Sequence, residues 1–188
     1  MLSLIGLIIL VPIFLIISIL IICTSGLPVF YLQNRVGRGN TNFKLYKFRT
    51  MKKDADKNGL LTVGGRDPRI TLTGYYLRKY KLDELPQLVN VFFGSMSLVG
   101  PRPEVRKYVE LYNAEQKKVL LVNPGITDYA SLEYFNENEL LAQSSDPEKT
   151  YINQIMPAKL ELNKKYINEK GLTKDIKIIF RTIGRIFW

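Results

Sequence analysis

The first 30 positions of the chain are almost uniformly apolar and carry no charged side chain. Residues 4–23 form one apolar run, interrupted only by Gly6, Pro12 and Ser18. As a helix, a run of this length reaches about 30 Å, the thickness of the hydrocarbon core of a bilayer. No basic segment precedes it, and it is long for the apolar part of a cleaved signal peptide. We therefore expect this segment to remain in the membrane.

Pro12 lies near the middle of the run. A proline removes one backbone hydrogen bond and clashes with the carbonyl four residues earlier, so a kink is expected just before it. A kinked helix can cross the bilayer, or it can turn back with both ends on one side, and the pattern leaves both forms open. The basic residues that begin at Arg35 place the following domain on the cytoplasmic side in either form. We assign residues 1–25 to the membrane helix and 26–188 to the cytoplasmic domain.

Beyond residue 28 the pattern changes to short apolar stretches separated by turn-forming residues. Residues 29–33 and 43–48 are rich in aromatic and β-branched side chains and predict two short strands, with a glycine-containing turn between them. Apolar residues at helical spacing predict helices over 73–80, 86–94, 104–122 and 149–168. Thr73 is expected to cap the first of these, and residues 97–103 to be extended. The sequence thus predicts a mainly helical α+β fold.

The end of the chain repeats apolar residues at helical spacing over residues 175–188, with basic residues between them. Such a helix suits the membrane interface, and we expect an interfacial amphipathic helix at about 173–188. Packing of the same stripe on the domain core fits the pattern equally well. The residues of the stripe are Ile176, Ile179, Phe180, Ile183 and Phe187.

Composition then removes whole classes of chemistry. The chain has no histidine, which excludes Ser-His-Asp and Cys-His catalysis and histidine-ligated zinc. Its single cysteine, Cys23, excludes internal disulfides and thiolate metal clusters. Catalysis must therefore use carboxylates, lysine, hydroxyl groups, or a metal held by oxygen ligands.

Positive charge is concentrated in one segment. Residues 31–81 hold 13 lysines and arginines against three acids, an excess equal to the whole net charge of +10. This excess predicts an anionic partner there, which could be phosphate groups, anionic lipid or nucleic acid. The plain alternative is a solvated basic face.

Two adjacent carboxylates, Asp83 and Glu84, precede the helix predicted to begin at Pro86. The positive end of that helix favours their ionised forms. One ionised carboxylate can attack phosphorus, and the two together can supply hard oxygens to Mg²⁺. The plain alternative is the acidity that is common at helix starts.

Several basic residues are candidate phosphate ligands. Arg102 lies between Pro101 and Pro103, a stiff setting that limits where its guanidinium can point and suits a diphosphate. Arg78 precedes Asp83 by five residues. Either arginine could instead form a structural ion pair.

Lys47 and Arg49 fall on one face of the second predicted strand, because strand side chains alternate with period two. Aromatic neighbours would bury their stems and leave the charged ends for phosphate. Protection of an edge strand by charge is the alternative.

Several of these segments occur together in an order that resembles the bacterial sugar transferase family, the small monotopic phosphoglycosyl transferases. Each motif is weak alone, but the ordered series is specific and covers nearly the whole chain. The motifs are PVFY (28–31), RVG (35–37), YKFRTM (46–51), DPRIT (67–71), LRK (77–79), LDELPQ (82–87), MSLVGPRPE (96–104) and NPGIT (123–127).

The resemblance implies a re-entrant membrane helix broken at Pro12, with both ends on the cytoplasmic face of the bacterial inner membrane. It implies Mg²⁺ dependence and a two-step reaction. Asp83 would attack the sugar-linked phosphate of a UDP-sugar and release UMP, and polyprenyl (undecaprenyl) phosphate would then take the phosphosugar.

The resemblance also implies roles for the other site residues. Glu84 would complete the dyad and share the metal, while Arg78, Arg102 and the Lys47/Arg49 strand would hold phosphates. The proline-rich stretch supplies the remaining predicted substrate-binding residues, which are Pro101, Pro103 and Glu104. A homo-oligomer is also a prediction of this interpretation.

Two departures from the family pattern bear on the site. Asp128 and Tyr129 follow Gly-Ile-Thr where a glycine and an aromatic are more usual, a position where a change could follow sugar specificity. Ser95 stands where the family usually has an acid.

Two rival functions fit the same sequence. One is a non-catalytic basic module that docks on membrane surfaces. The other is a membrane-tethered nucleic-acid binder, but Tyr75 and Tyr76 are more easily core residues than stacking platforms, so no nucleic-acid partner is expected.

Overall fold

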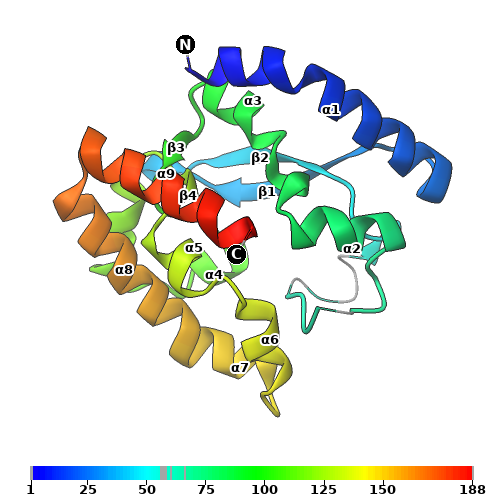
Figure 1. Ribbon diagram of the computed structural model, residues 1–188. Helices are drawn as coiled ribbons and strands as arrows, with labels where there is room; N and C mark the ends of the chain where they lie inside the picture. Colours follow the sequence, from blue (N-terminus) through cyan, green and yellow to red (C-terminus); the bar gives the residue numbers. More distant parts are fainter. Residues whose placement is uncertain (1, 56–58, 60, 66, 188) are drawn as a thin grey trace.

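The computed structural model describes residues 2–55, 59, 61–65 and 67–187, and it is mostly helical with a few short strands, as predicted. A long N-terminal helix, α1 (Leu2–Ser25), lies across one side of a compact domain (Figure 1). The domain begins with a two-stranded hairpin, continues through short helices and two more short strands, and ends in two longer helices.

Helix α1 is continuous through Pro12. Its residues Ser3–Ser25 are long and apolar enough to cross a membrane, and most of their surface is exposed. The predicted kink and the re-entrant path stay predictions.

One stripe of α1 nevertheless packs on the domain. Ile17 and Ile21 are buried against Phe48 and Leu77, and Leu82 packs on the same cluster. Nearer the N-terminus, Gly6 lies close to Leu88, so both halves of the helix touch the domain.

The predicted hairpin is confirmed. Strand β1 (Phe30–Val36) pairs antiparallel with β2 (Asn42–Phe48), with Phe30 opposite Phe48. The turn η1 (Arg38–Asn40) requires left-handed backbone at Gly39 (φ 68°) and Asn40 (φ 61°). Glycine and asparagine tolerate this conformation better than other residues, so the local sequence explains the turn.

Helix α2 (Leu72–Lys79) starts slightly before its predicted cap. Thr71 caps it by accepting a hydrogen bond from the backbone N–H of Gly74, so the prediction of Thr73 as cap was wrong by one half-turn. The reason is that Thr71 is also fixed by a backbone bond to Thr50 of the preceding segment. After α2 come the 3₁₀ turn η3 (Leu82–Glu84) and α3 (Gln87–Phe92), whose start at Pro86 was predicted.

Two further strands were not recognised in the sequence. The extended stretch after α3 contains β3 (Ser97–Val99), which pairs in parallel with β4 (Gly125–Thr127). Each has only three residues, too few for a period-two pattern to stand out.

The long helix predicted over 104–122 is wrong. The structure has only α4 (Arg106–Val109) and the 3₁₀ segment η4 (Gln116–Leu121). Asn113 and Gln116 exchange bonds between each side-chain oxygen and the other's backbone N–H. Side-chain bonds of this kind compete with the helical backbone ladder and close a turn instead.

The rest of the chain is helical, as predicted for 149–168. The elements are α5 (Tyr129–Glu133), α6 (Glu137–Ala142), α7 (Pro147–Thr150), the π-helical turn η5 (Tyr151–Ile155), α8 (Met156–Glu169) and α9 (Leu172–Phe187). The largest core cluster joins α4, η4 and α8 with the turn η5.

Helix α9 presents two different faces. Ile178 is buried in a core cluster with Val99 and Tyr166. The opposite side carries four exposed apolar residues from the predicted stripe, and contact of this stripe with lipid stays a prediction. These residues are Ile176, Phe180, Ile183 and Phe187.

Candidate active site

Asp83 sits in a tight turn beneath the apolar helix α1. Lys81, which precedes the turn η3, has a left-handed backbone (φ 54°), and Leu82 packs against the α1 cluster. These two constraints place the Asp83 side chain inside the domain, where it is 6% exposed. Its Oδ1 atom is buried and has no hydrogen-bond partner among the described residues. A buried carboxylate oxygen without a partner is costly, which marks it as a candidate for binding or chemistry.

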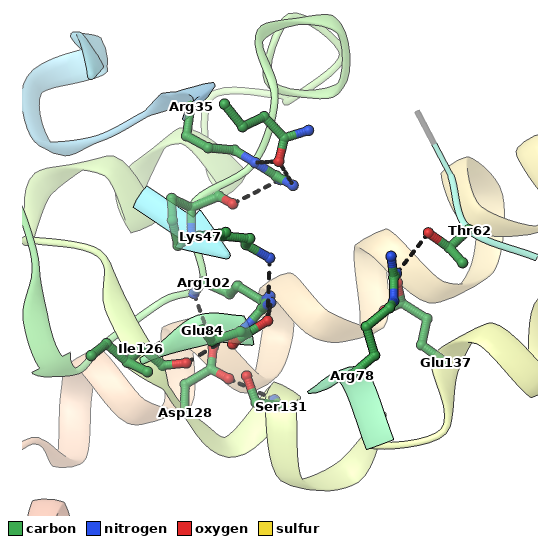
Figure 2. Close-up of polar contacts among 12 residues, drawn as sticks. Arg35, Lys47, Thr62, Arg78, Glu84, Arg102, Ile126, Asp128, Ser131 and Glu137 are labelled. Carbon is green, nitrogen blue, oxygen red and sulfur yellow. Dashed lines mark hydrogen bonds and ion pairs between the residues drawn. The ribbon is translucent and has the colours of Figure 1, made fainter. Parts of the chain in front are cut away.

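Glu84 lies beside it and is fully engaged. Both its oxygens accept hydrogen bonds from the guanidinium of Arg102, with Nη1 to Oε2 at 3.0 Å, and the ammonium of Lys47 lies 3.3 Å from Oε1. Figure 2 shows Glu84 between these two cations, which come from β2 and from the stretch after β3. One carboxylate therefore joins three segments that are far apart in the sequence.

The two neighbouring carboxyls differ in pKa. Burial, followed by the negative charge of Glu84, raises the pKa of Asp83 above its ordinary 3.8. Burial would also raise the pKa of Glu84, but the charges of Arg102 and Lys47 outweigh it and hold that pKa well below its ordinary value. The positive end of α3 was expected to favour the ionised forms of both groups. For Asp83, desolvation acts in the opposite direction and raises the pKa. Two adjacent carboxyls with opposed pKa shifts can take different roles.

The pKa values of the two cations beside Glu84 are shifted as well. Burial lowers the pKa of Lys47, although the charge of Glu84 opposes this. The charge of Glu84 raises the pKa of Arg102 above its ordinary value. Arg102 thus remains a fixed positive charge beside the dyad.

Helix α3 fixes the strand that carries Lys47. The side chain of Asn90 accepts from the backbone N–H of Tyr46 and donates to the carbonyl of Lys44, at 3.0 and 2.8 Å. Asn90 also bonds Ser95, at the position where the family usually has an acid. Sequence reasoning missed Asn90 because an asparagine inside an apolar helix carries no local signal of a long-range partner.

The stretch around Arg102 is held by close backbone contacts. A Cβ on Gly125 would lie 2.1 Å from the backbone nitrogen of Gly100, and a Cβ on Gly100 would in turn meet the backbone near Gly125. Both positions therefore require glycine. Pro101 and Pro103 are buried and stiffen the segment between. Arg102 is therefore presented by rigid backbone, as the sequence predicted.

Asp128 completes this support. It is fully buried, and its two oxygens accept from the backbone N–H groups of Arg102, at 3.2 Å, and Ser131, at 2.6 Å. The second bond makes Asp128 the N-cap of α5. The Asp-x-x-Ser spacing could have indicated the cap, but not the contact with Arg102.

Glu104 lies behind the dyad rather than in it. It pairs with Arg35 at 2.9 Å and accepts from the hydroxyl of Tyr151. Although burial acts to raise the pKa of Glu104, Arg35 and Lys159 outweigh it and lower this pKa. In this arrangement Glu104 braces the end of β1 against the helical half of the domain.

The remaining two arginines point elsewhere. Arg78, at the end of α2, donates to the hydroxyl of Thr62 at 2.8 Å, away from Glu84 (Figure 2), although its charge still acts to lower the pKa of Asp83. Arg49 is buried and donates to the carbonyls of Ser25 and Leu27 at the end of α1. Lys47 and Arg49 therefore do not share one site, and phosphate binding by Arg78 and Arg49 stays a prediction.

The acidic groups of the site are compatible with Mg²⁺. Within the part of the chain that the structure describes, no three acidic side chains gather as a complete metal cage. Mg²⁺, however, usually takes one or two protein carboxylates and fills its remaining positions with water and substrate phosphates. The unpartnered Oδ1 of Asp83 supplies a hard oxygen of this kind.

Comparison with known proteins decides the family. Residues 1–188 match the model of the family described as "Bacterial sugar transferase". The chain belongs to this family. An Aeromonas hydrophila relative, named UDP-N-acetylgalactosamine-undecaprenyl-phosphate N-acetylgalactosaminephosphotransferase, is 37% identical over 178 residues, which cover 93% of this chain and 39% of that protein.

Two other relatives of this chain carry names of the same kind. The UDP-glucose:undecaprenyl-phosphate glucose-1-phosphate transferase of Escherichia coli is 34% identical over 94% of this chain and 36% of its own length. A putative undecaprenyl-phosphate N-acetylgalactosaminyl 1-phosphate transferase of Bacillus subtilis is 47% identical over 60% of this chain and 63% of its own length. The chain thus spans less than two thirds of these relatives, which are named as enzymes that use undecaprenyl phosphate.

Proposed function

We propose that this chain transfers a phosphosugar from a UDP-sugar to undecaprenyl phosphate and releases UMP, as a membrane step in the assembly of a bacterial glycoconjugate. The observation that carries the proposal is the buried, unpartnered Oδ1 of Asp83 beside a glutamate that is saturated by two cations. The names of the relatives support the acceptor and the reaction class.

In the first step an oxygen of ionised Asp83 attacks the phosphorus that bears the sugar. The bond from this phosphorus to the bridging oxygen breaks, and UMP leaves with that oxygen. Asp83 then carries the phosphosugar as an acyl phosphate. Glu84 cannot play this part in the observed arrangement, because its oxygens are occupied by Arg102 and Lys47.

In the second step a phosphate oxygen of undecaprenyl phosphate attacks the same phosphorus. The bond to Asp83 breaks, the carboxylate is regenerated, and the product is a lipid-linked diphosphate sugar. Phosphoryl transfer depends mainly on positioning and charge neutralisation, which the fixed charge of Arg102 and the nearby Lys47 suit. Mg²⁺ bound through Asp83, with Glu84 nearby, would add neutralisation of the diphosphate.

We place the reaction at the cytoplasmic face of the inner membrane. The exposed apolar surface of α1 and the basic segment that follows it support this placement. A helix that spans the bilayer would carry its first half away from the domain, whereas Gly6 lies against Leu88. This contact favours a re-entrant or surface-lying helix.

The test is a panel of UDP-sugars with undecaprenyl phosphate and Mg²⁺, with released UMP as the readout. We expect one or more donors to be used, and Asp83→Asn to abolish UMP release. Asp54→Asn, which removes an exposed acid from the basic segment, is the matched control. With donor alone, intact-protein mass spectrometry should show a phosphosugar adduct that maps to Asp83. Absence of the adduct while product forms would overturn the covalent mechanism, and salt-sensitive vesicle binding without turnover would favour the non-catalytic module.

A further inference from the structure

Two cations near Asp83 have no part in the contacts described above. The ammonium of Lys81 lies 4.9 Å from the centre of the Phe135 ring, and the guanidinium of Arg185 lies 5.9 Å from the same centre. Lys81 is two residues before Asp83, and Arg185 is in the last turn of α9. The fold therefore brings two positive charges to one aromatic ring beside the catalytic turn.

These two cations differ from the others at the site in their ion pairing. Lys47 and Arg102 are both paired with Glu84. Neither Lys81 nor Arg185 forms an ion pair with a carboxylate of the described residues, and the acid nearest in sequence on α6, Glu137, is paired with Lys159 at 2.6 Å. Two like charges held on one ring, with no ion pair to a carboxylate in the part of the chain that the structure describes, form a site that an anion would stabilise.

Arg185 is held there by the packing of α9. The hydroxyl groups of Thr182 and Thr127 form a hydrogen bond at 2.6 Å. Thr127 directly precedes Asp128, which accepts a hydrogen bond from the backbone N–H of Arg102. Arg185 follows Thr182 by three residues and so lies on the same helix face. The inward face of α9 is thus fixed next to the site by a contact that does not involve Arg185.

The outward face of α9 indicates which anion this is. It presents the exposed stripe that includes Phe180, Ile183 and Phe187, of which Phe180 and Phe187 are each 71% exposed. A ligand with an isoprenoid tail and a phosphate head matches both faces of the helix, whereas a nucleotide matches only the charged one. The site near Glu84 already provides cations for a diphosphate.

We propose that Lys81 and Arg185, positioned on Phe135, form the subsite that binds the phosphate of the lipid acceptor, with the isoprenoid tail beside the exposed stripe of α9. The proposal rests on the function proposed above. It adds that donor and acceptor phosphates occupy different cation sets, so that weakening one need not weaken the other.

The test measures binding directly, without turnover. The full-length protein in lipid nanodiscs is titrated with undecaprenyl phosphate, with undecaprenol as the uncharged counterpart, and with UDP as the probe of the donor site. We expect Arg185→Gln to weaken binding of undecaprenyl phosphate about tenfold or more, with little effect on undecaprenol or UDP. Arg185→Lys should restore part of the affinity, since it keeps the charge but not the planar fork.

Arg181→Gln is the matched control, because it removes the same charge from the exposed surface of the same helix without a contact to Phe135. A melting temperature measured for each variant identifies any that fail to fold. Equal binding of undecaprenyl phosphate and undecaprenol by the wild type would overturn the proposal. So would an equal loss in Arg181→Gln, or a loss of UDP binding in place of acceptor binding. If the proposed transferase activity failed instead, no UMP would be released from any donor, an outcome recorded in a separate assay.

Discussion

At the scale of single residues, the site depends on an unequal pair. Asp83 and Glu84 are neighbours with the same chemistry, yet Oδ1 of Asp83 has no hydrogen-bond partner among the described residues, whereas both oxygens of Glu84 accept hydrogen bonds. Their burial, together with the placement of Arg102 and Lys47, makes this difference, and no property of the two residues alone could predict it.

Asp83→Asn should separate stability from activity. Removal of a buried carboxyl whose pKa is raised relieves desolvation and repulsion from Glu84, so we expect a gain of about 1 kcal/mol in the free energy of unfolding at neutral pH. Turnover should fall at least ~1000-fold, because the proposed nucleophile is lost. Denaturation midpoints and UMP release measure the two effects, and a destabilised Asp83→Asn protein would contradict this account of the site.

Glu84→Gln, in contrast, should lower the free energy of unfolding. It leaves two largely buried cations without their acid, and loss of one partner of such a cluster costs about 3 kcal/mol. When Glu84→Gln is combined with Arg102→Gln, the loss in the free energy of unfolding should be smaller than the sum of the two single losses. The reason is that the double variant no longer leaves an unpaired arginine in the cluster. Additive losses in a double-mutant cycle would show that the pair is not coupled.

The pH dependence of the reaction follows from the pKa of Asp83. The proposed attack requires the ionised form, and burial together with Glu84 raises this pKa, so kcat/KM should be lost as the pH falls through a value above 3.8. The charge of Lys81 opposes the rise. Lys81→Gln should therefore move the acid limb of the profile to higher pH. An unchanged or lowered limb would contradict the prediction, and Arg181→Gln is the charge-matched comparison.

At the scale of elements, the sequence predicted what depends on local pattern. The hairpin, the start of α3 and the helical segment of 149–168 follow from propensity and spacing. The failed helix over 104–122 has an apolar pattern that is helical, but the reciprocal bonds of Asn113 and Gln116 close a turn inside it. The β3–β4 pair and the bonds of Asn90 depend on residues distant in the chain, which a reading of local windows does not reach.

The same distinction applies to the site. The dyad and the stiff Arg102 segment were found because their motif is contiguous in sequence. Asp128, Phe135 and Arg185 approach the site only through the packing of α5 and α9. The separation of Lys47 from Arg49 likewise arises because the end of α1 takes up the guanidinium of Arg49.

Gly74 lies where α2 packs closely against the backbone of Thr50. A Cβ on Gly74 of α2 would lie 2.0 Å from the carbonyl oxygen of Thr50, which is backbone and cannot rotate away. Gly74→Ala should therefore cost about 3 kcal/mol or more in the free energy of unfolding. Gly65→Ala, where no atom lies within 4 Å, should change it by no more than about 0.5 kcal/mol. Chemical denaturation of the two variants compares them, and equal stability would show that α2 can shift away from Thr50.

At the scale of the whole molecule, the path of α1 sets which surfaces face lipid. A cysteine at the exposed position Ile5, in a Cys23→Ser background, reports the location of the N-terminal end. In sealed inverted vesicles, whose cytoplasmic face points outward, we expect an impermeant thiol reagent to label it as readily as a cysteine at Ser145 of the domain surface. Labelling only after the vesicles are opened would favour a full membrane span.

The contact between α1 and Leu82 has a wider consequence. The turn that carries Asp83 rests directly on α1, a helix that we propose lies in the membrane. A thinner bilayer or a short-chain detergent that shifts α1 would disturb that turn through one neighbouring side chain, while the rest of the domain keeps its fold. Under the proposed function, lipid would then act on this protein in two ways: it would supply the acceptor, and its thickness would set the position of the turn that carries Asp83.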